Sequence, residues 1–88
     1  MISVKEKFII KKLAHRYRAR KIMLFGSSLS KKLSRDIDLG VEGLPAEKFF
    51  RFYGDLLFSL PKSVDLIDLS RDTKFTRLVR QEGLTIYG

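Results

Sequence analysis

The spacing of apolar side chains switches between helical and strand periodicity along the chain. Between residues 4 and 18, apolar residues recur three and four positions apart, and Ser3 and Glu6 match a helix capping box at the start. The apolar run Ile22–Phe25 stops at Gly26 and has the length of a buried strand. This region is therefore predicted to form a helix over residues 4–18 followed by a strand.

The same alternation continues to the end of the chain. Residues 36–41 alternate apolar and polar, as a strand does, and helical spacing returns over residues 46–60. A further strand is predicted over 64–69, then a helix capped within residues 70–72 and ending at Glu82, with residues 84–87 as a candidate fourth strand. We expect one domain, residues 1–88, of the α/β (α+β) class, with a mixed sheet of three to four strands in the order α-β-α-β-α-β-α.

The predicted helix over residues 46–60 is apolar on more than one side. One stripe holds Phe49, Tyr53, Leu56, Leu57 and Leu60, and the side chains off that stripe include Phe50, Phe52 and Phe58. Such a helix is either sandwiched in the core or exposes an apolar patch that binds another chain. We expect Phe49 and Tyr53 in the core and some of the other aromatic residues in contact with a partner chain. A second copy of this chain is one possible partner, so a homodimer is one alternative.

Composition and charge narrow the classes of function. The 88 residues include no cysteine, which excludes disulfides and thiolate metal sites, and His15 is the single histidine, so we expect it on the surface. No apolar run approaches the ~20 residues that span a bilayer, and no signal peptide is seen, so we expect a cytoplasmic protein without membrane contact. Eight basic residues and one acidic residue fall within residues 1–21 of this +8 chain. That cluster fits nucleic acid, nucleotide phosphates, an acidic partner or simply a solvated helix face.

Two carboxylates lie two positions apart on a predicted strand. Asp36 and Asp38 should project from the same face, because side chains two apart on a strand do so. Such a pair predicts a divalent-metal platform, and two solvent-exposed aspartates are the alternative. Asp65 and Asp68 on the next predicted strand are three apart, so only one of them can join the pair.

The order of these motifs resembles one known family. The motifs are Phe25-Gly26-Ser27, then Asp36-Ile37-Asp38-Leu39, then an aspartate in Val64-Asp65-Leu66. In this order they resemble the signature of a minimal nucleotidyltransferase (MNT) domain of the DNA polymerase beta-like superfamily. The resemblance implies that Asp36, Asp38 and Asp65 are catalytic and hold two Mg²⁺ ions, with Asp65 also acting as the base.

The resemblance also implies a nucleotide site beside the Gly-Ser turn, with ATP as the substrate. The residues expected to bind the nucleotide are Gly26, Ser27, Ser28, Lys31 and Lys32. Ser28 stands where many relatives carry Arg, and the connection between Ser27 and Asp36 is short, with eight intervening residues. Lys31, Lys32 and Arg35 are therefore the candidates to supply positive charge to a triphosphate.

The partner implied by the resemblance is a HEPN-domain toxin. The first hypothesis is a metal-dependent protein adenylyltransferase, an antitoxin that transfers AMP from ATP to a tyrosine of the toxin. The second is a non-catalytic antitoxin module that neutralises the partner by masking it. Nucleic-acid binding rests on net charge alone and is not expected, because the aromatic residues fall mostly at core spacing and no recognition motif is present.

Overall fold

The computed structural model describes residues 2–29 and 35–88, in which three α-helices, one short 3₁₀ helix and four strands occur. They are α1 (Val4–Arg16), β1 (Lys21–Leu24), the 3₁₀ helix η1 (Gly26–Leu29), β2 (Asp36–Glu42), α2 (Ala46–Ser59), β3 (Ser63–Asp68), α3 (Lys74–Glu82) and β4 (Leu84–Tyr87). The strand order is β3-β2-β1-β4, with β2 and β3 parallel and the other neighbours antiparallel. The predicted α+β class is confirmed, and residues 84–87 form the fourth strand.

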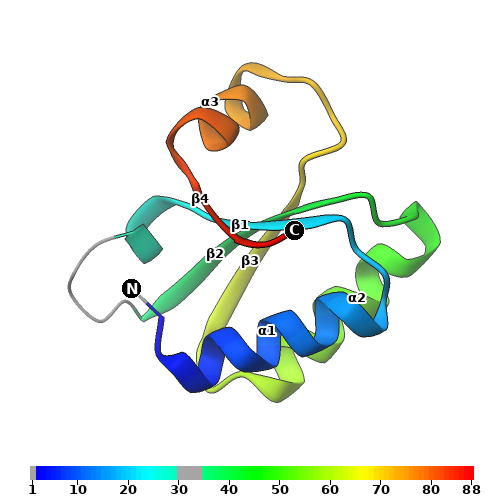
Figure 1. Cartoon of the computed structure of the whole chain (residues 1–88), viewed down its shortest axis with the longest axis vertical. Helices are drawn as coiled ribbons and strands as arrows, with labels where there is room; N and C mark the ends of the chain where they lie inside the picture. The colour runs from blue at the N-terminus through cyan, green and yellow to red at the C-terminus, as the bar shows by residue number, and fades with distance from the viewer. Residues whose placement is uncertain (1, 30–34) are drawn as a thin grey trace.

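The sheet separates two layers of helix (Figure 1). Helices α1 and α2 cover one face of the sheet, and α3 lies on the other. The larger core, between the sheet and α1 and α2, includes the fully buried Ile10, Ile22, Leu39, Phe52 and Leu56. A smaller core of Met23, Leu69 and Val79 lies beneath α3, with Phe25 and Ile67 packed against it. Strand β3 contributes to both cores, through Val64 and Leu66 on one face and Ile67 on the other.

Helix α2 packs in two directions, and this corrects the predicted stripe. Phe52 was expected to fall off the buried stripe but is fully buried, and its ring meets that of Tyr17 edge-on at a centroid distance of 5.4 Å. Leu57, expected on the stripe, is 48% exposed, because contact with α1 as well as with the sheet rotates the buried side. Phe50 and Phe58 are 79% and 92% exposed, as a partner-binding role requires. None of the helices in the described residues is long and apolar enough to cross a membrane.

Helix α1 starts where the sequence predicts and ends two residues early. The capping box is present, because the Ser3 hydroxyl accepts the Glu6 amide at 3.0 Å and the Glu6 carboxylate accepts the Ser3 amide at 2.8 Å. The helix ends at Arg16 rather than near Arg18, since Arg18 adopts a left-handed conformation with φ of 59°. Such a residue cannot continue a right-handed helix.

Helix α3 begins later than predicted. Its N-cap is Thr73, whose hydroxyl accepts the Thr76 amide at 3.1 Å while the Thr76 hydroxyl accepts the Thr73 amide at 2.9 Å. The cap expected within residues 70–72 is therefore wrong. Asp72 instead accepts two hydrogen bonds from the Arg77 guanidinium, at 2.7 and 2.9 Å. Two threonines thus form the hydrogen bonds that cap the start of α3.

Candidate functional site

The three candidate carboxylates lie on neighbouring parallel strands. Asp38 of β2 is directly opposite Asp65 of β3, and Asp36 is opposite Ser63. Residues Ile37 and Leu39, which alternate with the aspartates, are fully buried beneath α1 and α2. Because paired residues of neighbouring strands share a face, Asp36, Asp38 and Asp65 all point to the face that carries α3.

Register also decides which aspartate of β3 joins the pair. Asp68 has the same parity as the buried Val64 and Leu66, so it is on the opposite face from Asp65. Its carboxylate accepts the Ser70 amide at 2.9 Å and holds the turn after β3. The sequence left this choice open, and the parallel pairing of β2 with β3 selects Asp65.

The carboxylates supply the donor atoms that magnesium prefers, but they do not converge. Across residues 2–29 and 35–88, no group of three or more carboxylate, imidazole or thiol side chains lies close enough to hold a metal ion. Asp36 and Asp65 are exposed and Asp38 is partly exposed. Directly opposite residues on neighbouring strands lie roughly 5 Å apart, so side-chain rotation is sufficient to bring Asp38 and Asp65 together. Oxygen donors of this kind suit Mg²⁺, and the metal site stays a prediction.

Gly26 lies against the central carboxylate. It has a positive φ of 62°, and a Cβ atom at this position would lie 2.6 Å from Oδ2 of Asp38. Both the backbone conformation and the close approach therefore require glycine. The chain leaves β1 at this point, with the Phe25 amide still donating to the Asp38 carbonyl at 3.0 Å.

The side chain of Ser28 holds β2 and does not face a ligand. Ser28 is fully buried. Its hydroxyl accepts a hydrogen bond from the Asp38 amide at 2.7 Å and donates one to the Asp36 carbonyl at 3.3 Å. These are backbone groups for which β1 no longer supplies partners once the chain turns into η1. The hydroxyl thus continues the strand ladder and fixes the backbone of both aspartates, and the predicted contact of Ser28 with a nucleotide is left to its backbone.

The other predicted nucleotide-binding residues are less informative. Ser27 belongs to η1, next to Gly26. Lys31 and Lys32 lie outside the described residues, and Arg35 is exposed immediately before β2. Contact of these side chains with a triphosphate therefore stays a prediction.

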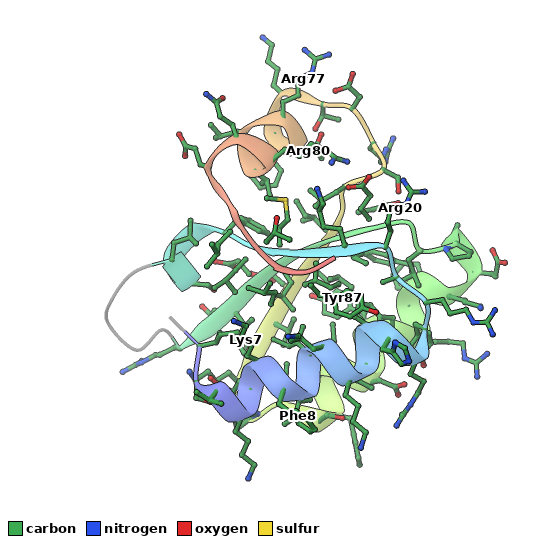
Figure 2. The ribbon with its side chains drawn as sticks, in the orientation of Figure 1. Lys7, Phe8, Arg20, Arg77, Arg80 and Tyr87 are labelled. Atoms are coloured by element: carbon green, nitrogen blue, oxygen red, sulfur yellow. The ribbon has the colours of Figure 1, made fainter. Side chains whose placement is uncertain are left out.

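The basic cluster near the N-terminus lies away from the carboxylates. Lys5, Lys7, Lys11 and Lys12 are exposed on α1, on the face of the sheet opposite to α3, and Figure 2 shows Lys7 with Phe8 on this helix. Their position does not support a role in binding nucleotide phosphates beside Asp38. His15 is exposed on the same helix, as expected.

An ion-pair network fixes α3 to the sheet. The Glu42 carboxylate at the end of β2 accepts hydrogen bonds from the guanidinium groups of Arg80 of α3, at 2.9 Å, and Arg20, at 3.4 Å. The Arg80 guanidinium also donates a hydrogen bond to the Leu69 carbonyl. The hydrogen bond from Arg80 lowers the pKa of Glu42 below its ordinary value of 4.5. Periodicity along the chain carries no signal for this pairing, because Glu42 and Arg80 lie 38 positions apart.

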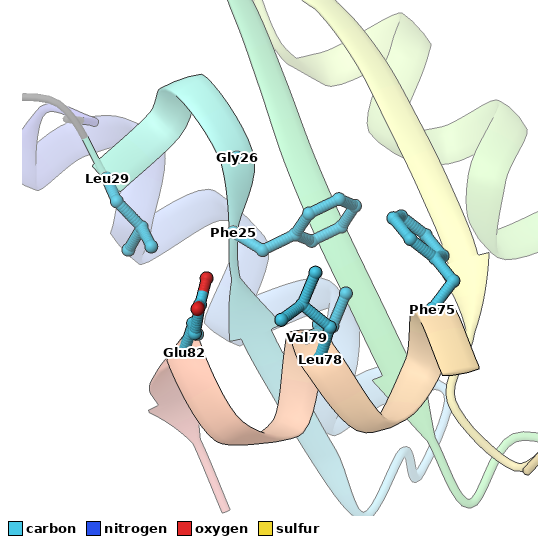
Figure 3. Close-up of a pocket in the computed structure, with 8 residues that line it drawn as sticks. Phe25, Gly26, Leu29, Phe75, Leu78, Val79 and Glu82 are labelled. Carbon is cyan, nitrogen blue, oxygen red and sulfur yellow. The ribbon is translucent and has the colours of Figure 1, made fainter. Parts of the chain in front are cut away.

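A pocket that sequence reasoning missed opens between η1 and α3 (Figure 3). Its volume is about 270 Å³, and its lining includes Phe25, Gly26, Leu29, Phe75, Leu78 and Glu82. Phe75 and Leu78 of α3 are each about half exposed. The available signal was that Phe75, Leu78 and Val79, the apolar residues of α3, recur at helical spacing on one side of a helix that is otherwise polar.

Comparisons with known proteins identify the family and the fold. Residues 7–88 match the protein family described as polymerase beta, nucleotidyltransferase. A chain of the crystal structure of a toxin-antitoxin with AMP-PNP is 27% identical, with a TM-score of 0.75 over 93% of this chain and 73% of that chain. A chain of tri-AMPylated Shewanella oneidensis HEPN toxin in complex with MNT antitoxin is 26% identical, with a TM-score of 0.74 over 96% and 71%. The toxin-antitoxin MntA-HepT structure, at 24% identity and a TM-score of 0.75 over 98% and 73%, supports the fold alone. No curated protein matches significantly.

Proposed function

The chain belongs to the polymerase beta nucleotidyltransferase family, and we propose that it transfers AMP from ATP to a tyrosine of a HEPN-type toxin, acting as the antitoxin of that toxin. The observation that carries the proposal is the register that sets Asp38 opposite Asp65, with Gly26 against the Asp38 carboxylate. Support also comes from similar structures at 26% and 27% identity, which contain an AMPylated HEPN toxin and AMP-PNP.

Each element of the site has a distinct task in this reaction. Asp36, Asp38 and Asp65 would hold magnesium, which supplies positive charge for the phosphates and the leaving group. The phenolic oxygen of the tyrosine forms a bond to the α-phosphorus, the bond from that phosphorus to the bridging oxygen breaks, and pyrophosphate leaves with the electron pair. Asp65 takes the phenolic proton, since it is exposed and makes no hydrogen bond or ion pair within the described residues. Gly26 lets the phosphates approach the backbone closely.

The direct test combines the chain with the HEPN-type protein encoded beside it, ATP and magnesium. We expect the intact mass of the HEPN-type protein to increase by whole AMP units. Asp38→Asn should abolish the increase, because it removes a central carboxylate, whereas Asp72→Asn should not, because Asp72 is exposed and pairs with Arg77 away from the site. Equal labelling by the wild-type and Asp38→Asn proteins would exclude the mechanism.

A masking antitoxin is the second candidate. Phe50 and Phe58 of α2 are 79% and 92% exposed, which is unusual for a solvent-facing helix and suits partner contact. If masking is sufficient, Asp38→Asn protein still suppresses the toxicity of the partner in cells, and a Phe50→Ala, Phe58→Ala double variant does not.

A further inference from the structure

The pocket between η1 and α3 opens on the same side of the sheet as the carboxylates. Helix α3 packs on that face, because a Cβ at Gly40 of β2 would lie 2.8 Å from the side chain of Leu69, the residue that lies beneath α3. Gly40 shares its face with Asp38, two positions away. The pocket therefore lies beside the candidate site and not on the surface covered by α1 and α2.

Gly26 belongs to both the pocket and the candidate site. It lines the pocket on one side, and the position of its absent Cβ is 2.6 Å from the Asp38 carboxylate on the other. A ligand whose phosphates lie at this turn can therefore extend its remaining part directly into the pocket. At about 270 Å³ the pocket is slightly smaller than the roughly 300–1,000 Å³ sites that enclose whole drug-sized ligands, so it suits one ring system of a nucleotide.

The side chains that line the pocket are apolar except for one hydrogen-bond acceptor, the carboxylate of Glu82. Phe25 and Phe75 meet edge-on at a centroid distance of 5.8 Å, and Leu29, Leu78 and Val79 complete the apolar wall. Figure 3 shows Glu82 projecting from the end of α3 toward this wall, and its carboxylate makes no hydrogen bond or ion pair within the described residues. An ionised carboxylate only accepts hydrogen bonds, so it selects a flat apolar ligand that carries a donor on its edge.

We propose that this pocket binds the base of the nucleotide and that Glu82 selects a purine with an exocyclic amino group. The inference rests on the proposed function, because the phosphates must lie at Gly26 for the base to reach the pocket. Aromatic and aliphatic side chains contact the faces and edges of the ring, and Glu82 accepts a hydrogen bond from the amino group. Adenine and guanine both carry such a group, at positions 6 and 2 respectively.

The test measures base selectivity in the presence of magnesium. Binding of ATP, purine riboside triphosphate, GTP and inosine triphosphate to the full chain is followed by isothermal titration calorimetry. The second and fourth nucleotides lack the amino group of the first and third, so each pair isolates one hydrogen bond. We expect ATP to bind about two- to tenfold tighter than purine riboside triphosphate, the range for one net hydrogen bond. Glu82→Ala should abolish this difference, whereas the matched control Glu47→Ala on the exposed start of α2 should preserve it.

A leucine pair tests the apolar wall independently. Leu78 in the pocket and Leu57 on α2 are both 48% exposed, so truncating either removes a similar area from the protein surface. Leu78→Ala should weaken ATP and purine riboside triphosphate equally and by several-fold, and Leu57→Ala should change neither. Equal effects of the two truncations would overturn the pocket assignment.

The outcomes separate this inference from the function on which it rests. If all four nucleotides bind equally and Glu82→Ala changes nothing, the base site is wrong while nucleotide binding stands. If no nucleotide binds with magnesium, both proposals fail. A preference for GTP over inosine triphosphate that depends on Glu82 would support the base site and identify guanine, which would overturn ATP as the substrate.

Discussion

The role of Ser28 can be tested with a single substitution, Ser28→Ala. Its hydroxyl is fully buried and joins the Asp38 amide and the Asp36 carbonyl, at 2.7 and 3.3 Å. Removing it leaves the Asp38 amide without its acceptor in a part-buried position. The geometry therefore predicts a loss of stability even when no nucleotide or metal is present.

The magnitude follows from the missing hydrogen bonds. A buried donor left without a partner costs about 1–3 kcal/mol. A domain of this length has a free energy of unfolding of roughly 4–13 kcal/mol, so the loss is a substantial part of the total. Each kcal/mol lowers the melting temperature of a domain this small by about 4–8 °C, which predicts a decrease of roughly 4–24 °C.

Urea denaturation and thermal melting of the protein alone provide the assay. Ser63→Ala is the matched control, because Ser63 is exposed on β3 and makes no side-chain hydrogen bond within the described residues; its change should stay within about 0.5 kcal/mol. The reasoning is refuted if Ser28→Ala is as stable as this control but binds ATP with magnesium more weakly. That result would assign the hydroxyl to the ligand instead of to the strand.

Three further predictions concern the turn, α3 and α1. Gly26→Ala should lower the urea midpoint of unfolding, because a φ of 62° costs a residue with a Cβ about 1–2 kcal/mol. Calorimetry should also show that the variant loses magnesium-dependent ATP binding, and unchanged binding would contradict the proposed site. Glu42→Gln should reduce the free energy of unfolding at neutral pH only. Arg80 lowers the pKa of Glu42, so the Glu42 carboxylate stabilises the fold above pH 4.5, and this stabilisation is lost as the pH falls through the pKa of the folded state. Urea titrations of both proteins at about pH 7 and about pH 3 measure this, and a difference that is independent of pH would count against the ion pair. Tyr17→Phe should cost about 0.5–1.5 kcal/mol in thermal melting, since it removes the 2.5 Å hydrogen bond to Asp55 but keeps the ring, and a neutral change would mean that water replaces that bond.

The sequence pattern predicted the bounds of the helices and strands more accurately than it predicted how they pack against one another. Alternation over residues 36–41 and helical spacing over 46–60 gave β2 and α2 to within one residue at each end. The error at Phe52 arose because a single stripe assumes that a helix packs in one direction, whereas α2 contacts both α1 and the sheet. The error at the start of α3 had a different cause, since several residues between 70 and 76 are able to cap a helix and the tertiary structure selects Thr73.

For the candidate site, periodicity alone places Asp36 and Asp38 on one face, because side-chain direction along a strand is a local property. Three other features of the site emerge from the folded chain alone: Asp65 rather than Asp68 lies beside the pair, the Ser28 hydroxyl binds the backbone of β2, and a pocket with Glu82 adjoins Gly26. Each of these depends on how distant segments are placed against one another, through strand register and helix packing, which periodicity along the chain does not specify.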